Sequence, residues 1–83
     1  MDLRLIEQRL SSVLKIAHAW LPDEQLAEMQ SLVNAGEPGV ALENFWTQLE
    51  EYDVRVPEEV VRELKDLACA MGMSVPSWIE RGS

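Results

Sequence analysis

The chain has 83 residues, of which 47% are hydrophobic, and this length and composition predict one globular domain spanning residues 1–83. The 15 acidic and 7 basic side chains give a formal net charge of −8, which disfavours binding to nucleic acid or anionic membranes and favours basic partners. A single cysteine excludes an intrachain disulfide, and no apolar stretch approaches the ~20 residues that span a bilayer.

Apolar residues recur every three or four positions along the chain, which is the spacing of amphipathic helices. Pro22, Pro38 and Pro57 each stand just before such a stripe, where a missing N–H costs little. Gly36 and Gly72 follow a stripe and can adopt the left-handed conformation that ends a helix. No window shows sustained alternation, so no strand is expected. The predicted helices span residues 3–20, 22–34, 38–52 and 57–71, with a short turn at 76–81.

The connections between these helices are short, so consecutive helices are expected to pack antiparallel as a small all-α bundle. Leu3 begins the apolar stripe of the first helix, and Phe45 and Leu49 mark the core side of the third. Trp46 lies about a quarter of a turn from that stripe and is expected at its edge. Cys69 stands between two alanines and is expected to be a packed structural thiol.

Nothing in the chain predicts catalysis, a cofactor or a metal site. His18 is the only histidine and falls at a predicted helix end. A calcium loop starting at Asp53 fails, because Glu58 stands where the loop requires glycine. The N-terminal residues lack the layout of a signal peptide, so the expected location is the cytoplasm.

The negative charge is concentrated in residues 37–66, which hold nine acidic and three basic side chains. Acidic residues crowd the predicted end of the third helix, where the partial negative charge of the helix terminus disfavours them. Glu59 and Glu63 form a like-charged pair one turn apart, which costs a few tenths of a kcal/mol unless a cation lies near. Trp46 and Tyr52 lie beside these acidic residues, a common arrangement of interface anchors, and a core or half-buried packing role is the favoured alternative for each. For the acidic residues the alternative is a solvated face that only aids solubility. The residues predicted to contact a partner are Glu43, Trp46, Glu50, Glu51, Tyr52, Asp53, Glu58 and Glu59.

Three segments within residues 34–73 resemble the small α-helical immunity proteins of the Maf type: "GEPGVALE", "LEEYDVRVPEE" and a helix ending in "MGM". These immunity proteins accompany polymorphic toxins and contact-dependent growth inhibition systems in bacteria. The resemblance covers about half of the chain. It implies binding and neutralisation of a cognate toxin C-terminal domain, often a basic nuclease, without catalysis.

The sequence thus predicts a cytoplasmic immunity protein that is a monomer when free and forms a 1:1 complex with a basic toxin domain. It has no expected role with nucleic acid or membrane. An acidic regulatory adaptor or a nucleic-acid mimic remains the alternative interpretation, because it needs the same acidic surface.

Overall fold

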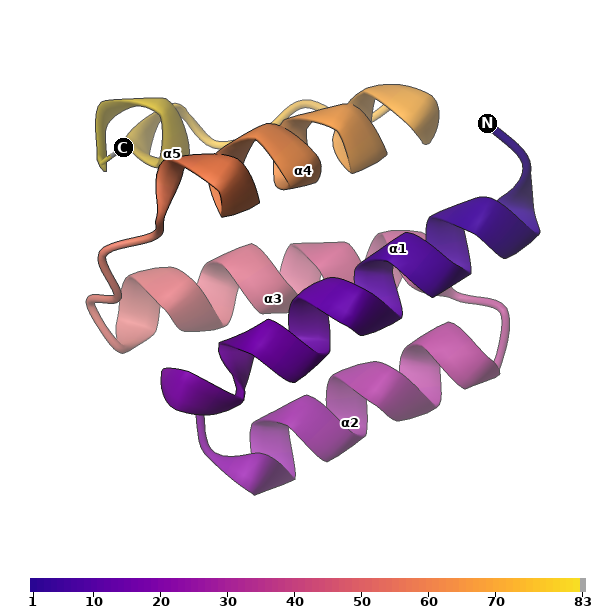
Figure 1. Ribbon diagram of the computed structural model, residues 1–83, viewed down its shortest axis with the longest axis horizontal. Helices are drawn as coiled ribbons and strands as arrows, with labels where there is room; N and C mark the ends of the chain where they lie inside the picture. The colour runs from indigo at the N-terminus through magenta and orange to yellow at the C-terminus, as the bar shows by residue number, and fades with distance from the viewer. Residues whose placement is uncertain (83) are drawn as a thin grey trace.

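The structure, a computed structural model, describes the backbone of residues 1–82 and the side chains of residues 1–79. It confirms the predicted all-α fold, and no strand occurs in this part of the chain (Figure 1). The molecule measures 28 × 26 × 17 Å along its principal axes. Its elements are α1 (Leu3–Ile16), the 3₁₀ helix η1 (Ala17–Ala19), α2 (Asp23–Asn34), α3 (Pro38–Glu51), α4 (Glu58–Ala70) and α5 (Ser77–Gly82). The predicted C-terminal turn is therefore the short helix α5.

Local chemistry explains where the helices begin. The Asp2 side chain caps α1 by accepting a hydrogen bond of 2.8 Å from the backbone N–H of Leu5. Pro22 and Pro57 precede α2 and α4, and each of these two helices carries two carboxylates in its first turn, where the helix dipole favours them. Pro38 is itself the first residue of α3, where its missing N–H is not needed.

Three helices end in the same hydrogen-bonded turn. In each, a residue in the left-handed conformation follows the helix, and the next backbone N–H reaches a carbonyl five residues earlier. Gly36 ends α2 and Gly72 ends α4 in this way, with φ of 80° and 69°. At the end of α3 the same position is held by Asp53, with φ of 51°. Asp53 is the one residue other than glycine with positive φ in the described chain.

Helix α3 is the centre of the fold. It contacts α1, α2 and α4, and Figure 1 shows it behind α1, between α2 below and α4 above. Because three helices surround it, residues on several sides of α3 are buried, with Leu42, Phe45 and Leu49 fully enclosed. The core contains no buried polar or charged residue among the described side chains.

The predicted placements of Leu3 and Cys69 are wrong. Leu3 is 54% exposed, because it lies at the free start of α1 beyond the helices that pack on it. Cys69 is exposed on α4, so it is not a packed thiol. Helix α1 is also shorter than the predicted span of residues 3–20, because the last turn of that span is the 3₁₀ helix η1.

Candidate functional site

The predicted acidic residues gather where α3 ends and α4 begins. Glu50 and Glu51 form the last turn of α3, Asp53 follows in the connecting loop, and Glu58 and Glu59 open α4. All five side chains are exposed. We call these five residues the acidic junction. It lies on the left of Figure 1, at the turn that joins the two helices.

The loop of the acidic junction is held by alternate side chains. Val56 is buried and Val54 packs against the core, whereas Asp53 and Arg55 are exposed. The backbone N–H groups of Asp53 and Val54 also bind α3 carbonyls, at 3.1 and 2.9 Å. The loop is therefore anchored from inside and directs its charged residues outward.

The carboxylates of this region differ in their ion pairing. Glu58 pairs with Arg62 one turn along α4, at 3.0 Å. Glu50, Glu51 and Asp53 form no ion pair among the described side chains. The last turn of α3 contains no basic residue either. The uncompensated charge is thus greatest at the end of α3, where the helix dipole opposes it.

The remaining predicted contact residues divide into two groups. Tyr52 is 49% exposed and lies within the acidic junction, and Glu43 is exposed two turns earlier on α3. Trp46 is only 8% exposed, so it does not lie at the edge of the helix, and its burial agrees with the alternative packing role. Trp46 is part of the core and offers no surface to a partner in this conformation.

The fold brings further acidic residues to the same end of the molecule. In Figure 1 the C-terminal ends of α1 and α3 and the N-terminal ends of α2 and α4 all lie on the left. Asp23 and Glu24 open α2 there and are both exposed. Sequence reasoning missed this neighbourhood, because Glu24 and Glu50 are far apart along the chain. The expected antiparallel topology could have revealed it, because such a topology places the C-terminal ends of the first and third helices at the same end of the bundle.

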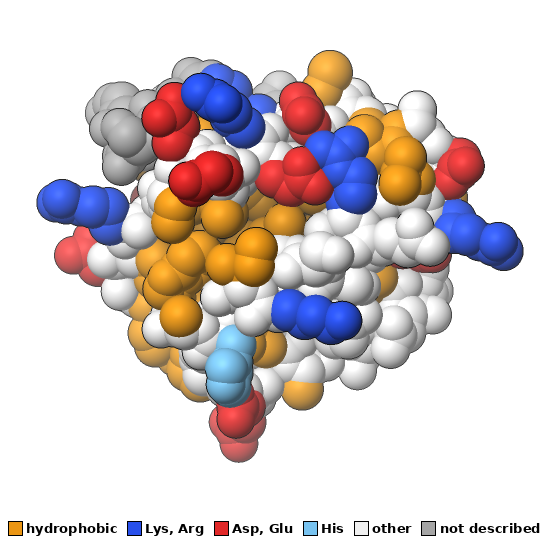
Figure 2. Space-filling view, viewed as in Figure 1, with side chains coloured by type: hydrophobic (Ala, Val, Ile, Leu, Met, Phe, Trp, Pro, Cys, Tyr) orange, Lys and Arg blue, Asp and Glu red, His pale blue; other side chains and the backbone are white. Residues whose placement is uncertain are grey.

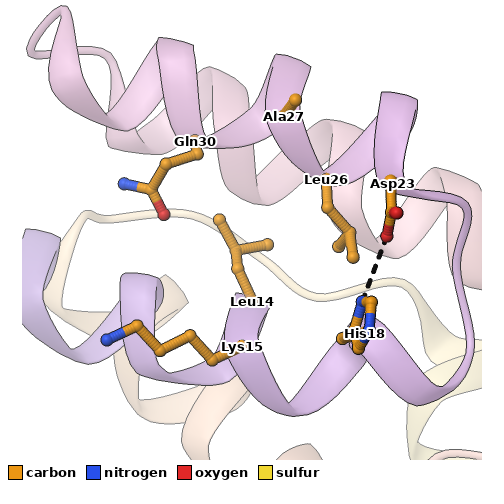
Figure 3. A pocket seen from close by; sticks show the side chains of 7 residues that line it. All are labelled: Leu14, Lys15, His18, Asp23, Leu26, Ala27 and Gln30. Atoms are coloured by element: carbon orange, nitrogen blue, oxygen red, sulfur yellow. Dashed lines mark ion pairs between the residues drawn. The ribbon is translucent and has the colours of Figure 1, made fainter.

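A shallow groove of about 380 Å³ runs between α1 and α2 beside this end (Figure 3). Leu14 and Leu26 form its apolar floor, and Lys15 and Gln30 lie along it. His18 closes one end by a polar contact of 3.1 Å between its Nδ1 and an Asp23 Oδ1. Both of these side chains are largely exposed. The margin of the groove is thus polar and exposed to solvent. None of the described residues that line the groove is a buried polar residue that would orient a small ligand.

The described residues offer no group of three or more His, Cys, Asp or Glu side chains that could hold a metal ion. No helix within residues 1–82 has the length and apolar character needed to cross a membrane. Comparisons of the chain with protein-family models, with curated proteins and with solved structures found no match.

Proposed function

We propose that this protein is an immunity protein, which binds and neutralises a cognate bacterial toxin domain through the acidic junction, without catalysis of its own. The observation that carries the proposal is the unpaired charge at the end of α3. Glu50, Glu51 and Asp53 are exposed, lack ion-pair partners among the described residues and stand at a helix terminus that disfavours them.

These three residues work against the stability of the free protein. Each carboxylate near a helix C-terminus costs about 0.3–1 kcal/mol at low salt. Asp53 also occupies a backbone conformation that costs a residue other than glycine about 1 kcal/mol. Glu58 and Glu59 differ, because they stand at a helix N-terminus, where the dipole explains them without a partner. A residue set that lowers stability is a stronger indication of binding than one that raises it.

The chemistry of such a surface suits a partner with clustered lysines and arginines. Complementary charge raises the association rate and excludes partners of the wrong sign. Occupying a basic active site or a basic surface beside it would keep a nuclease from its phosphate substrate, which needs the same cations. The resemblance in residues 34–73 supports this class of partner, since those segments include the acidic junction.

The test begins with the protein encoded immediately upstream of this gene, which the proposal expects to be a toxin. Expression of its C-terminal domain alone should arrest growth, and co-expression of this chain should restore growth and yield a 1:1 complex. A matched pair of variants then locates the surface. Glu50→Gln with Glu51→Gln should weaken protection, whereas Glu28→Gln with Glu37→Gln removes the same charge from exposed positions elsewhere and should not. Equal protection by both pairs contradicts the proposal.

A further inference from the structure

An apolar area lies beside the acidic junction. Figure 2 shows hydrophobic side chains gathered over the left part of the molecule, where Figure 1 places the ends of α1 and α3 and the loop that leads to α4. On these elements Ile16 and Tyr52 are 54% and 49% exposed. Trp20 and Val54 are partly buried and pack against the core. We call these four residues the apolar patch.

Two of the four residues of the apolar patch, Ile16 and Tyr52, are about half exposed. Ile16 is the last residue of α1, and it is exposed although Val13 and Leu14 before it are buried. An exposed isoleucine and a half-exposed tyrosine on helices that finish at the same end of the molecule leave apolar area in contact with water. Interfaces are built in this way, with an apolar centre that excludes water and a polar rim that sets specificity.

The rim of the apolar patch holds more acidic than basic side chains. In Figure 2 acidic side chains border the patch above, an acidic and a basic side chain lie together at the left edge, and the histidine with an acidic neighbour lies below. The exposed basic residues Lys15 and Arg55 adjoin Ile16 and Val54 in the chain. Asp53 adjoins both Tyr52 and Val54 in the chain, and Asp23 pairs with His18. A second copy of this protein, also of net charge −8, would bring acidic rims together. Charge complementarity therefore favours a basic occupant over self-association.

We propose that the apolar patch is the centre of the partner-binding surface, and that it receives an apolar side chain from a basic segment of the partner. On this proposal the lysines or arginines that flank this side chain in the partner reach Glu50 and Asp53 on one side and the start of α2 on the other. The inference rests on the proposed function and adds to it the chemistry of the segment that is bound: apolar at its centre and cationic on both sides.

The test uses two synthetic peptides of 15 residues with the same number of lysines, one with leucine between the lysines and one with serine. Binding is measured by titration, and the site by backbone amide shifts. The leucine peptide should bind at least fivefold more tightly and shift the amides of the apolar patch. Ile16→Gln should remove this preference without changing net charge. Leu3→Gln is the matched control, because Leu3 has the same exposure of 54% at the opposite end of α1 and should leave binding unchanged.

The outcomes separate this inference from the proposed function. If both peptides bind equally and Glu50→Gln with Glu51→Gln weakens both, the surface is purely electrostatic, so the apolar centre is wrong and the proposed function stands. If neither peptide binds, the end of the molecule does not attract basic segments and both proposals fail. If sedimentation shows a dimer that Ile16→Gln dissolves, the apolar patch belongs to a second copy and the inference is overturned.

Discussion

Arg9 of α1 and Glu63 of α4, which are 54 residues apart in the chain, form a bidentate ion pair that joins the two helices. The Arg9 Nε donates to one Glu63 carboxylate oxygen at 2.7 Å and its Nη2 donates to the other. A second contact of 3.5 Å joins Arg9 to Asp66. The hydrogen bond from Arg9 lowers the pKa of Glu63, and the same bond raises the pKa of Arg9. Arg9 is therefore a cation bound to one member of the like-charged pair Glu59 and Glu63, which offsets the repulsion expected from the sequence.

The Glu63 carboxylate should make stability depend on pH in one direction. Because its pKa is lowered in the folded protein, its contribution is complete above its unfolded value of about 4.3 and is lost as pH falls through the folded value. Glu63→Gln should cost about 1 kcal/mol at pH 7 and almost nothing at pH 2.5. Urea unfolding at both pH values checks this. Glu28→Gln is the control, because Glu28 is exposed in the middle of α2 and forms no ion pair among the described side chains, and it should change stability little at either pH; an equal cost at pH 7 would count against the bidentate pair.

Asp53 should be replaceable by glycine with a gain in stability. Asp53 has φ of 51° in the position that Gly36 and Gly72 hold at the ends of α2 and α4. Asp53→Gly removes both the backbone strain and a carboxylate at a helix C-terminus, so unfolding should require about 1 kcal/mol more free energy. Asp53→Ala removes the charge but keeps the strain, and should gain less. Thermal unfolding followed by circular dichroism orders the three proteins, and an alanine variant more stable than the glycine variant would refute the strain argument.

Alanine variants of Trp46 and Tyr52 should distinguish a residue that packs in the core from one that is free to contact a partner. Trp46→Ala leaves a cavity in a buried site and should destabilise the fold by about 3–5 kcal/mol. Tyr52→Ala should cost under about 1 kcal/mol, because half of the tyrosine is already exposed. Chemical denaturation gives both values. A Trp46→Ala protein as stable as the wild type would mean that Trp46 is not a core residue, and would return it to the predicted surface.

Helix positions were predictable because the spacing of apolar residues and the positions of proline and glycine agree at most helix boundaries. The predicted second and third helices differ from α2 and α3 by one residue at one end, since Pro22, Pro38 and Gly36 fix the chain locally. The error at Trp46 has a different origin. A pattern along one helix does not reveal how many helices surround it, and α3 is contacted by three.

The acidic junction was predictable because its residues are close in sequence. The apolar patch was not predictable, because it depends on the C-terminal ends of α1 and α3 lying at the same end of the molecule. Ile16 belongs to no predicted stripe, and only its 54% exposure in the structure draws attention to it. The ion pair between Arg9 and Glu63 was equally inaccessible, because no local rule joins residues on the first and fourth helices.

The central claim is that the carboxylates at the end of α3 bind a basic toxin domain, and the most direct measurement is surface plasmon resonance across a salt series. Glu50→Lys with Asp53→Lys should stay folded, because both positions are exposed, although lysine suits the left-handed position of Asp53 less well. Its affinity for the toxin domain encoded upstream should fall at least ~100-fold, about 2.7 kcal/mol, mostly through slower association at low salt. Glu28→Lys with Glu37→Lys makes the same change in net charge at other exposed positions and should lose much less. A folded Glu50→Lys, Asp53→Lys protein that binds with unchanged rate and affinity would contradict the account.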